Sequence, residues 1–180
     1  MKSHFTTRDT TRISLLAALI CVSGYLIIPL PFSPVPATAQ SLAIMLTGSL
    51  LSPLHAFAAL TLFVFLGTIG LPVFAGGASG IGILFGPTGG YLAGFLFGAV
   101  TISLLKGKKP ELLRLGFANA VGGILVVYLM GLFRLSQLTG MTLGNAFMVG
   151  AAPFLVGDVI KVFLAAGIAW KITPHLRRKN

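Results

Sequence analysis

The chain alternates between long runs of apolar residues and short groups of proline, glycine or charged residues. A helix that crosses the hydrocarbon core of a bilayer needs about 20 mostly apolar residues. Runs of this kind predict six helices, at residues 13–31, 37–52, 54–71, 87–105, 112–133 and 151–171. Pro53 divides the second run from the third, and it suits the first turn of a helix because that turn does not use the N–H that proline lacks.

Composition indicates that these helices lie in a membrane. Hydrophobic residues make up 56% of the chain and charged residues only 9%, whereas soluble domains carry about 25% charged residues. The 23 glycines also suit helices that pack closely within a bilayer. We therefore predict an all-α integral membrane protein with six transmembrane helices, forming a single membrane domain over residues 1–180.

The basic residues predict how the helices are oriented. The net charge is +10, and lysine and arginine are enriched in the cytoplasmic loops of membrane proteins. With six helices, three basic clusters fall on one side, so both termini are predicted to be cytoplasmic. Lipid headgroups then explain the charge, and no nucleic-acid partner is required. The clusters are Lys2, Arg8 and Arg12; Lys106, Lys108, Lys109 and Arg114; and Lys171, Arg177, Arg178 and Lys179.

A cleaved signal peptide is an alternative interpretation of the N-terminal run. The basic start, the apolar stretch and the small residues at 37–39 resemble a signal sequence. Cleavage would leave five helices and would place one basic cluster on the outer side, which argues against it.

Two ionisable residues lie inside the last apolar run, APFLVGDVIKVFLAAGIAW (152–170). A charge at the centre of a membrane helix costs about 2.5–3.5 kcal/mol on insertion scales. Asp158 and Lys161 are three residues apart, so they share one helical face, in the outer half of the predicted span. In one interpretation they bind a solute, with Asp158 accepting N–H groups and Lys161 donating to an oxygen. The alternatives are an ion pair that only fixes helix packing, or a proton relay.

Further candidates for ligand contacts lie near the same outer side. The glycine-rich segment 70–86 predicts an outer loop that folds over a cavity, because glycine allows tight turns and close backbone approach. Tyr91, in the first turns of the fourth helix, either stacks on a ligand or belongs to the interfacial aromatic belt. The other candidates are Thr38 and Gln40 after the proline-rich loop, Asn119 in the fifth helix, and Gly76 and Gly77 in the loop.

Catalytic and metal-binding patterns are missing from the sequence. No G-x-x-x-x-G-K-[ST] motif for ATP occurs, and the three histidines and the single Cys21 are scattered. We therefore expect no enzymatic activity, no metal and no cofactor. The first helix carries small residues at four-residue spacing, which suit close docking of either an internal helix or a partner protein. They are Ser14, Ala17, Ala18 and Cys21.

Four motifs in order along the chain resemble one family of membrane proteins. They are PVPATAQ (34–40), GLPVFAGG (70–77), GPTGGYLAGF (86–95) and GDVIKV (157–162). Together they look like the BioY family, the biotin-specific substrate-binding (S) components of energy-coupling factor (ECF) transporters. The resemblance implies a compact six-helix protein in the bacterial plasma (inner) membrane, with biotin held near its extracytoplasmic face.

The resemblance also implies partners: a transmembrane coupling subunit and two cytoplasmic ABC-type ATPases that energise uptake. The coupling subunit would dock on the first helix, through Ser14 and Ala18 or through Ala17 and Cys21. In the cavity, Asp158 would accept the ureido N–H groups of biotin, and Lys161 would donate to a ureido or carboxylate oxygen. Two other functions are consistent with the residues: a self-sufficient oligomeric facilitator or proton-coupled carrier, and a purely structural membrane subunit.

Overall fold

The computed structural model describes residues 6–31, 33–108 and 111–177, the last three without their side chains. Lys2, Lys109, Arg178 and Lys179 of the basic clusters therefore lie outside the described residues. The long elements are α1 (Thr7–Ser23), α2 (Gln40–Leu50), α3 (Pro53–Thr68), α5 (Gly89–Leu105), α9 (Ala152–Arg177) and a continuous stretch made of α6 (Leu112–Asn119), the π-helix η2 (Ala120–Val126) and α7 (Val127–Thr139).

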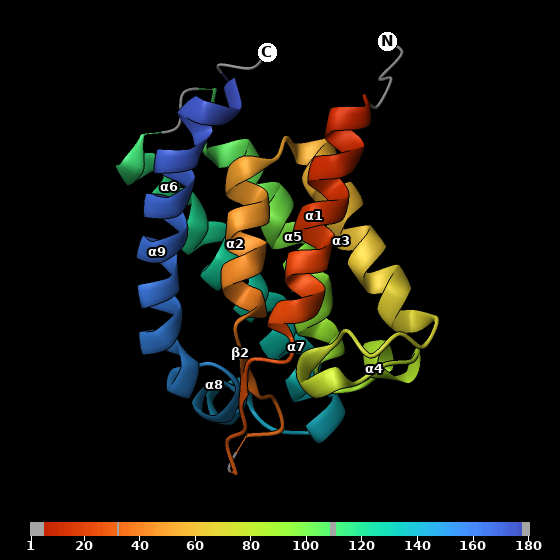
Figure 1. Ribbon diagram of the computed structural model, residues 1–180. Helices are drawn as coiled ribbons and strands as arrows, with labels where there is room; N and C mark the ends of the chain where they lie inside the picture. Colours follow the sequence, from red (N-terminus) through yellow and green to blue (C-terminus); the bar gives the residue numbers. More distant parts are fainter. Residues whose placement is uncertain (1–5, 32, 109–110, 178–180) are drawn as a thin grey trace.

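Short elements gather at one end of this helical bundle (Figure 1). The strands β1 and β2 form an antiparallel hairpin in which Ile27 pairs with Thr38 and Ile28 with Ala37. The other short elements are the 3₁₀ turn η1 (Ala75–Gly77), α4 (Gly82–Phe85) and α8 (Leu143–Gly150), and the strands are β1 (Ile27–Ile28) and β2 (Ala37–Thr38). The start of α1 and the end of α9 lie together at the opposite end (Figure 1).

The structure corrects the boundaries of two predicted helices. The first helix ends at Ser23 rather than at residue 31, because the chain turns at Gly24 and the apolar residues that follow enter the hairpin. The second helix begins at Gln40, and its 11 residues rise only about 16 Å. The apolar residues 25–31 therefore lie in the short elements at the end of the bundle. Their hydrophobicity alone does not distinguish this position from a continuation of the first helix.

The fifth predicted helix is longer than expected and is not a regular α-helix. It continues to Thr139, and α8 follows within the predicted loop 134–150. Its middle turns are the π-helix η2. Buried residues recur every fourth position through this region, at Asn119 just before η2, Gly123 within it and Val127 just after it. Because an α-helix has 3.6 residues per turn, such a stripe would drift around its surface, and the wider π turns keep it facing inward.

A row of glycines brings α5 against this stretch. A Cβ atom at Gly98 would lie 2.4 Å from the carbonyl oxygen of Gly122, and one at Gly94 would lie 2.9 Å from the Cα atom of Val127. At Gly90, a Cβ atom would lie 2.4 Å from that of Arg134. These three glycines, spaced four residues apart, thus let two helix backbones touch.

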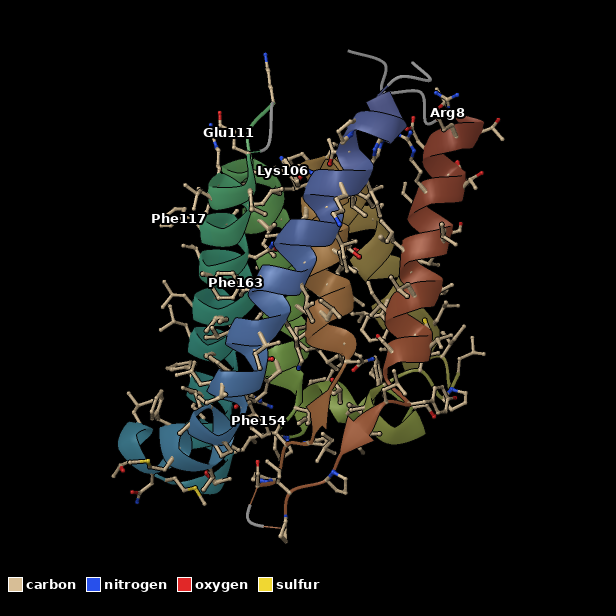
Figure 2. All side chains as sticks on the ribbon, turned by 60° about the vertical axis from the view of Figure 1, so that its left-hand side comes forward. Arg8, Lys106, Glu111, Phe117, Phe154 and Phe163 are labelled. Carbon is tan, nitrogen blue, oxygen red and sulfur yellow. The ribbon has the colours of Figure 1, made fainter. Side chains whose placement is uncertain are left out.

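The outer surface of the bundle is apolar. Phe117 and Phe163 project from its sides, 63% and 70% exposed, whereas Arg8 and Lys106 lie at one end (Figure 2). Two helices, Leu112–Thr139 and Ala152–Pro174, are long and apolar enough to cross a bilayer by themselves. A soluble protein rarely exposes apolar patches of this extent, so the exterior is suited to lipid.

The contact between α5 and η2 gives a test of the packing. We expect Gly98→Ala to destabilise the protein by about 1–3 kcal/mol, as for other overpacked cores, because its Cβ atom must displace the Gly122 backbone. Thermal unfolding of the detergent-purified protein measures the effect. The matched control is Gly116→Ala, since a Cβ atom there meets nothing within 4 Å; an equal loss in both variants would contradict the proposed close contact.

Candidate ligand-binding site

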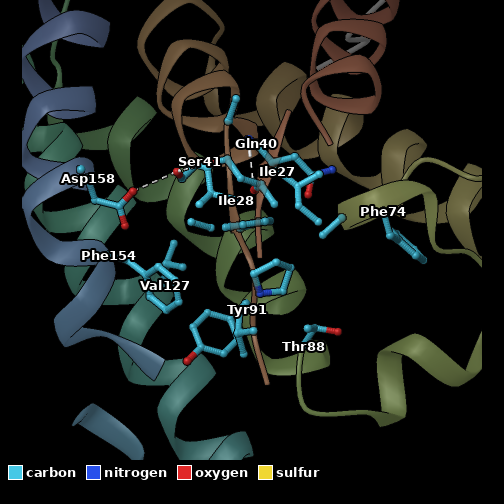
Figure 3. Close-up of a pocket in the computed structure, with 18 of the residues that line it drawn as sticks. Ile27, Ile28, Gln40, Ser41, Phe74, Thr88, Tyr91, Val127, Phe154 and Asp158 are labelled. Carbon is cyan, nitrogen blue, oxygen red and sulfur yellow. Dashed lines mark hydrogen bonds between the residues drawn. The ribbon is translucent and has the colours of Figure 1, made fainter. Parts of the chain in front are cut away.

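A cavity of about 730 Å³ lies at the hairpin end of the bundle, between α2, α5, α7 and α9 (Figure 3). Its volume falls in the range of small-molecule sites, about 300–1,000 Å³. Most of its wall is apolar, and polar side chains are concentrated on the side where α2 faces α9. The apolar wall includes Ile27, Ile28, Val35, Phe74, Leu92, Phe95, Val127 and Phe154.

Asp158 and Lys161 form the centre of the polar wall. Their side chains make an ion pair, with 2.9 Å between Lys161 Nζ and Asp158 Oδ1. Ser41 Oγ accepts from Lys161 at 2.8 Å and donates to Asp158 Oδ1 at 3.1 Å. Lys161 also donates to the Thr38 carbonyl oxygen at 2.8 Å, and Tyr128 donates its hydroxyl to Asp158 Oδ2 at 2.5 Å. The predicted pair therefore exists and is held by groups from three other segments.

Counting donors and acceptors shows what this wall offers a ligand. An ammonium group has three N–H donors and a carboxylate accepts about four hydrogen bonds. All three donors of Lys161 are used, but Oδ2 of Asp158 accepts only from Tyr128 among the described residues. Asp158 is 6% exposed and lines the cavity. The unused capacity is thus mainly that of an acceptor, which suits a ligand with N–H groups.

Gln40 also lines the cavity, at the first residue of α2. Its Nε2 donates to the carbonyl oxygen of Val73 at 3.0 Å and to that of Ile20 at 3.4 Å. These bonds tie the 70–86 loop and α1 to the start of α2. No partner for its Oε1 occurs among the described residues, so Gln40 presents a second acceptor.

Tyr91, in the first turn of α5, contributes an aromatic ring to the cavity wall (Figure 3). Its hydroxyl donates to the Gly150 carbonyl oxygen at 2.9 Å, which connects α5 to α8. The ring fills the space that the missing side chain of Gly131 leaves. A ring held in this way can cover an apolar ligand without changing its own hydrogen bond.

Three other predicted contacts do not line the cavity. Gly76 and Gly77 have φ angles of 70° and 77° and form the turn of the loop, while their neighbours Phe74, Ala75 and Ala78 reach the cavity. Asn119 lies apart, fully buried, where its Oδ1 accepts from Ser49 Oγ at 3.0 Å. Thr38, by contrast, lines the cavity in addition to bonding Lys161.

Ser41 and Tyr128 were not identified from the sequence. Ser41 follows Gln40 in the first turn of α2, and its sequence context is that of an ordinary helix residue. Tyr128 lies nine residues after Asn119. Residues nine apart in an α-helix lie on opposite faces, at about 100° per residue. Both Asn119 and Tyr128 nevertheless face inward, because η2 intervenes.

The small residues of α1 divide into two groups. Ser14 and Ala18 are exposed, Cys21 is half-buried, and Ala17 is only 1% exposed. Ala17 packs inside the fold and presents no surface to a partner. Among the described residues, no group of three or more histidine, cysteine or acidic side chains is placed to hold a metal ion.

The apolar exterior and the enclosed polar wall together define a membrane-embedded solute-binding protein. Comparison with known proteins identifies the family, because the profile of the BioY family matches residues 1–178. The chain therefore belongs to the BioY family, as the four motifs indicated.

Relatives and one solved structure agree with this assignment. The biotin transporter BioY of Rhizobium etli is 39% identical over 169 residues, covering 89% of this chain and 90% of that protein. The probable biotin transporter BioY of Bacillus subtilis is 36% identical, covering 93% and 91%. The crystal structure of the S-component for biotin from an ECF-type ABC transporter superposes with a TM-score of 0.86 at 28% identity, covering 100% of this chain and 95% of that one.

Proposed function

We propose that this chain binds biotin and acts as the S component of an ECF-type ABC transporter. The observation that carries the proposal is the apolar cavity with Asp158 on its one polar wall. Relatives named as biotin transporters and the solved S-component for biotin support it. Because the family consists of transporters, the chain is not an enzyme.

The chemistry of biotin matches the unused groups of the cavity. Its ureido ring carries two N–H groups, and Asp158 Oδ2 and Gln40 Oε1 can accept hydrogen bonds from them. Its sulfur-containing ring is apolar and suits the Tyr91 side of the wall. In this arrangement Lys161 donates to a ligand oxygen in place of the Thr38 carbonyl oxygen. No cofactor takes part.

The binding proposal is tested with a single variant and with a double variant that preserves the net charge. Breaking a buried charge pair at a binding site costs about 2–5 kcal/mol, so Asp158→Asn should weaken biotin binding about 30-fold or more; equilibrium binding of labelled biotin to the purified protein measures it. The double variant Asp158→Asn/Lys161→Met removes both charges, and should also bind poorly. Full affinity in the double variant would mean that the ion pair serves only helix packing.

Two controls accompany these variants. Asp9→Asn removes a carboxylate near the start of α1, and Lys171→Ala removes an ammonium group near the end of α9; both lie at the end of the bundle opposite to the cavity. Each should keep the affinity of the unaltered protein. Competition by other vitamins establishes selectivity, and absence of saturable biotin binding to the unaltered protein would refute the proposal.

We also infer the placement in the membrane. The described side chains of the three basic clusters, Arg8, Arg12, Lys106, Lys108, Arg114 and Lys171, belong to segments at the end opposite to the cavity, whereas Arg134 lies at the cavity end beside Phe85. The positive-inside rule assigns the end with the clusters to the cytoplasm. Six spans, cytoplasmic termini and an outward-facing cavity follow, in the plasma membrane of a bacterium.

Cysteine labelling tests this orientation. Cys21 is the single cysteine, so Cys21→Ser provides a background for Gly144→Cys in α8 and Lys108→Cys at the opposite end. In intact cells, a membrane-impermeant maleimide should label Gly144→Cys but label Lys108→Cys only after lysis. The reverse pattern would invert the proposed topology.

Energising partners form the last part of the proposal: a transmembrane coupling subunit and two ABC-type ATPases. Exposed Ser14 and Ala18 on α1 supply the docking face. We expect Ala18→Leu to abolish biotin uptake by cells while leaving biotin binding of the purified protein unchanged, because the added side chain blocks close helix approach. Uptake that persists in cells without the coupling subunit and ATPases would favour a self-sufficient carrier instead.

A further inference from the structure

The carboxylate of Asp158 is fixed from two sides by hydroxyl groups. Ser41 Oγ, on α2, donates to Oδ1 at 3.1 Å, and Tyr128 OH, on α7, donates to Oδ2 at 2.5 Å. Asp158 and Tyr128 are 6% and 9% exposed. The carboxylate points from α9 into the cavity (Figure 3). Each oxygen therefore has a donor from a different helix, so the carboxylate cannot rotate without breaking a bond.

The bond from Tyr128 has a particular consequence for a ligand. Without it, Oδ2 would have no donor among the described residues, and the carboxylate would be held only through Oδ1, by Lys161 and Ser41. With it, one acceptor position of Oδ2 is filled and the orientation of the other is set. A group held in its binding geometry before the ligand arrives loses less entropy on binding.

We propose that Tyr128 and Ser41 are positioning residues, which act through Asp158 to aim its remaining acceptor position at the N–H group of a cyclic urea. This inference rests on the proposed function. Tyr128 reaches Asp158 because the wide turns of η2 rotate the start of α7 toward the cavity, and Ser41 reaches it from the first turn of α2. Neither hydroxyl needs to touch the ligand.

If Tyr128 only linked α7 to α9, removing its hydroxyl would lower the stability of the protein without changing the orientation of the Asp158 carboxylate. The small number of acidic residues makes the two roles separable. The chain contains only three aspartate and glutamate residues, so the carboxylate band of Asp158 in infrared difference spectra on biotin binding can be assigned by its loss in Asp158→Asn.

The test uses the full chain, purified, with labelled biotin. A hydrogen bond to a charged group contributes about 1.5–3 kcal/mol, so Tyr128→Phe should weaken biotin binding about tenfold or more and should shift the Asp158 band. Tyr91→Phe is the matched control, since it also removes a hydroxyl from the cavity wall but one bonded to Gly150; it should leave the Asp158 band in place. Unchanged affinity in Tyr128→Phe, or weaker binding with an unshifted band, would overturn the inference.

Ser41 provides an independent pair of variants that does not depend on how well Tyr128→Phe folds. Ser41→Ala should weaken binding and shift the same band, whereas Ser41→Thr, which keeps the hydroxyl, should retain affinity. Equal losses in both would overturn the role of Ser41. Full affinity in Asp158→Asn would refute the proposed site and this inference together, whereas loss in Asp158→Asn with full affinity in Tyr128→Phe would refute the inference alone.

Discussion

The structure depends on the need to satisfy a buried charge pair. Removing an ion from water costs several kcal/mol even in a relaxed protein, and attraction between the partners offsets this only when further hydrogen bonds are made. Lys161 therefore uses all three of its donors, and Asp158 draws donors from α2 and α7. Three helices and the hairpin must meet at one point, and the cavity lies beside that point.

Close backbone packing on the other side of the cavity makes this meeting possible. Gly94 and Gly98 of α5 allow contact with Val127 and Gly122, and the π-helix η2 keeps the buried side of the long helix turned inward. π-Helical turns within α-helices are rare and occur frequently at functional sites. Here the turns of η2 orient Tyr128 toward Asp158.

Much of this was readable in the sequence, for identifiable reasons. Long apolar runs locate membrane helices because lipid imposes a length, and a charge within such a run stands out, which is how Asp158 and Lys161 were found. Residues 25–31 were misassigned because apolar residues that face a cavity look the same as those that face lipid. Tyr128 was missed because its orientation depends on η2. Asn119 lies away from the cavity because it is nine residues earlier along the same continuous helix, level with Ser49 at the other end of α2.

The two ends of the molecule differ in how their elements are held together. The cavity end is built from short elements, positive-φ glycines and a hairpin joined to the bundle through Gln40 and a few backbone bonds. At the opposite end, Lys106 holds the last turn of α2 by donating to the carbonyl oxygens of Gly48 and Ser49 at 3.0 and 2.9 Å. Elements with few buried contacts open at lower free energy than packed helices. The hairpin has few such contacts, whereas the 70–86 loop is anchored in the core by Phe74. Ligand entry is therefore expected to move the hairpin while α2, α5 and α9 keep the Asp158 cluster in place.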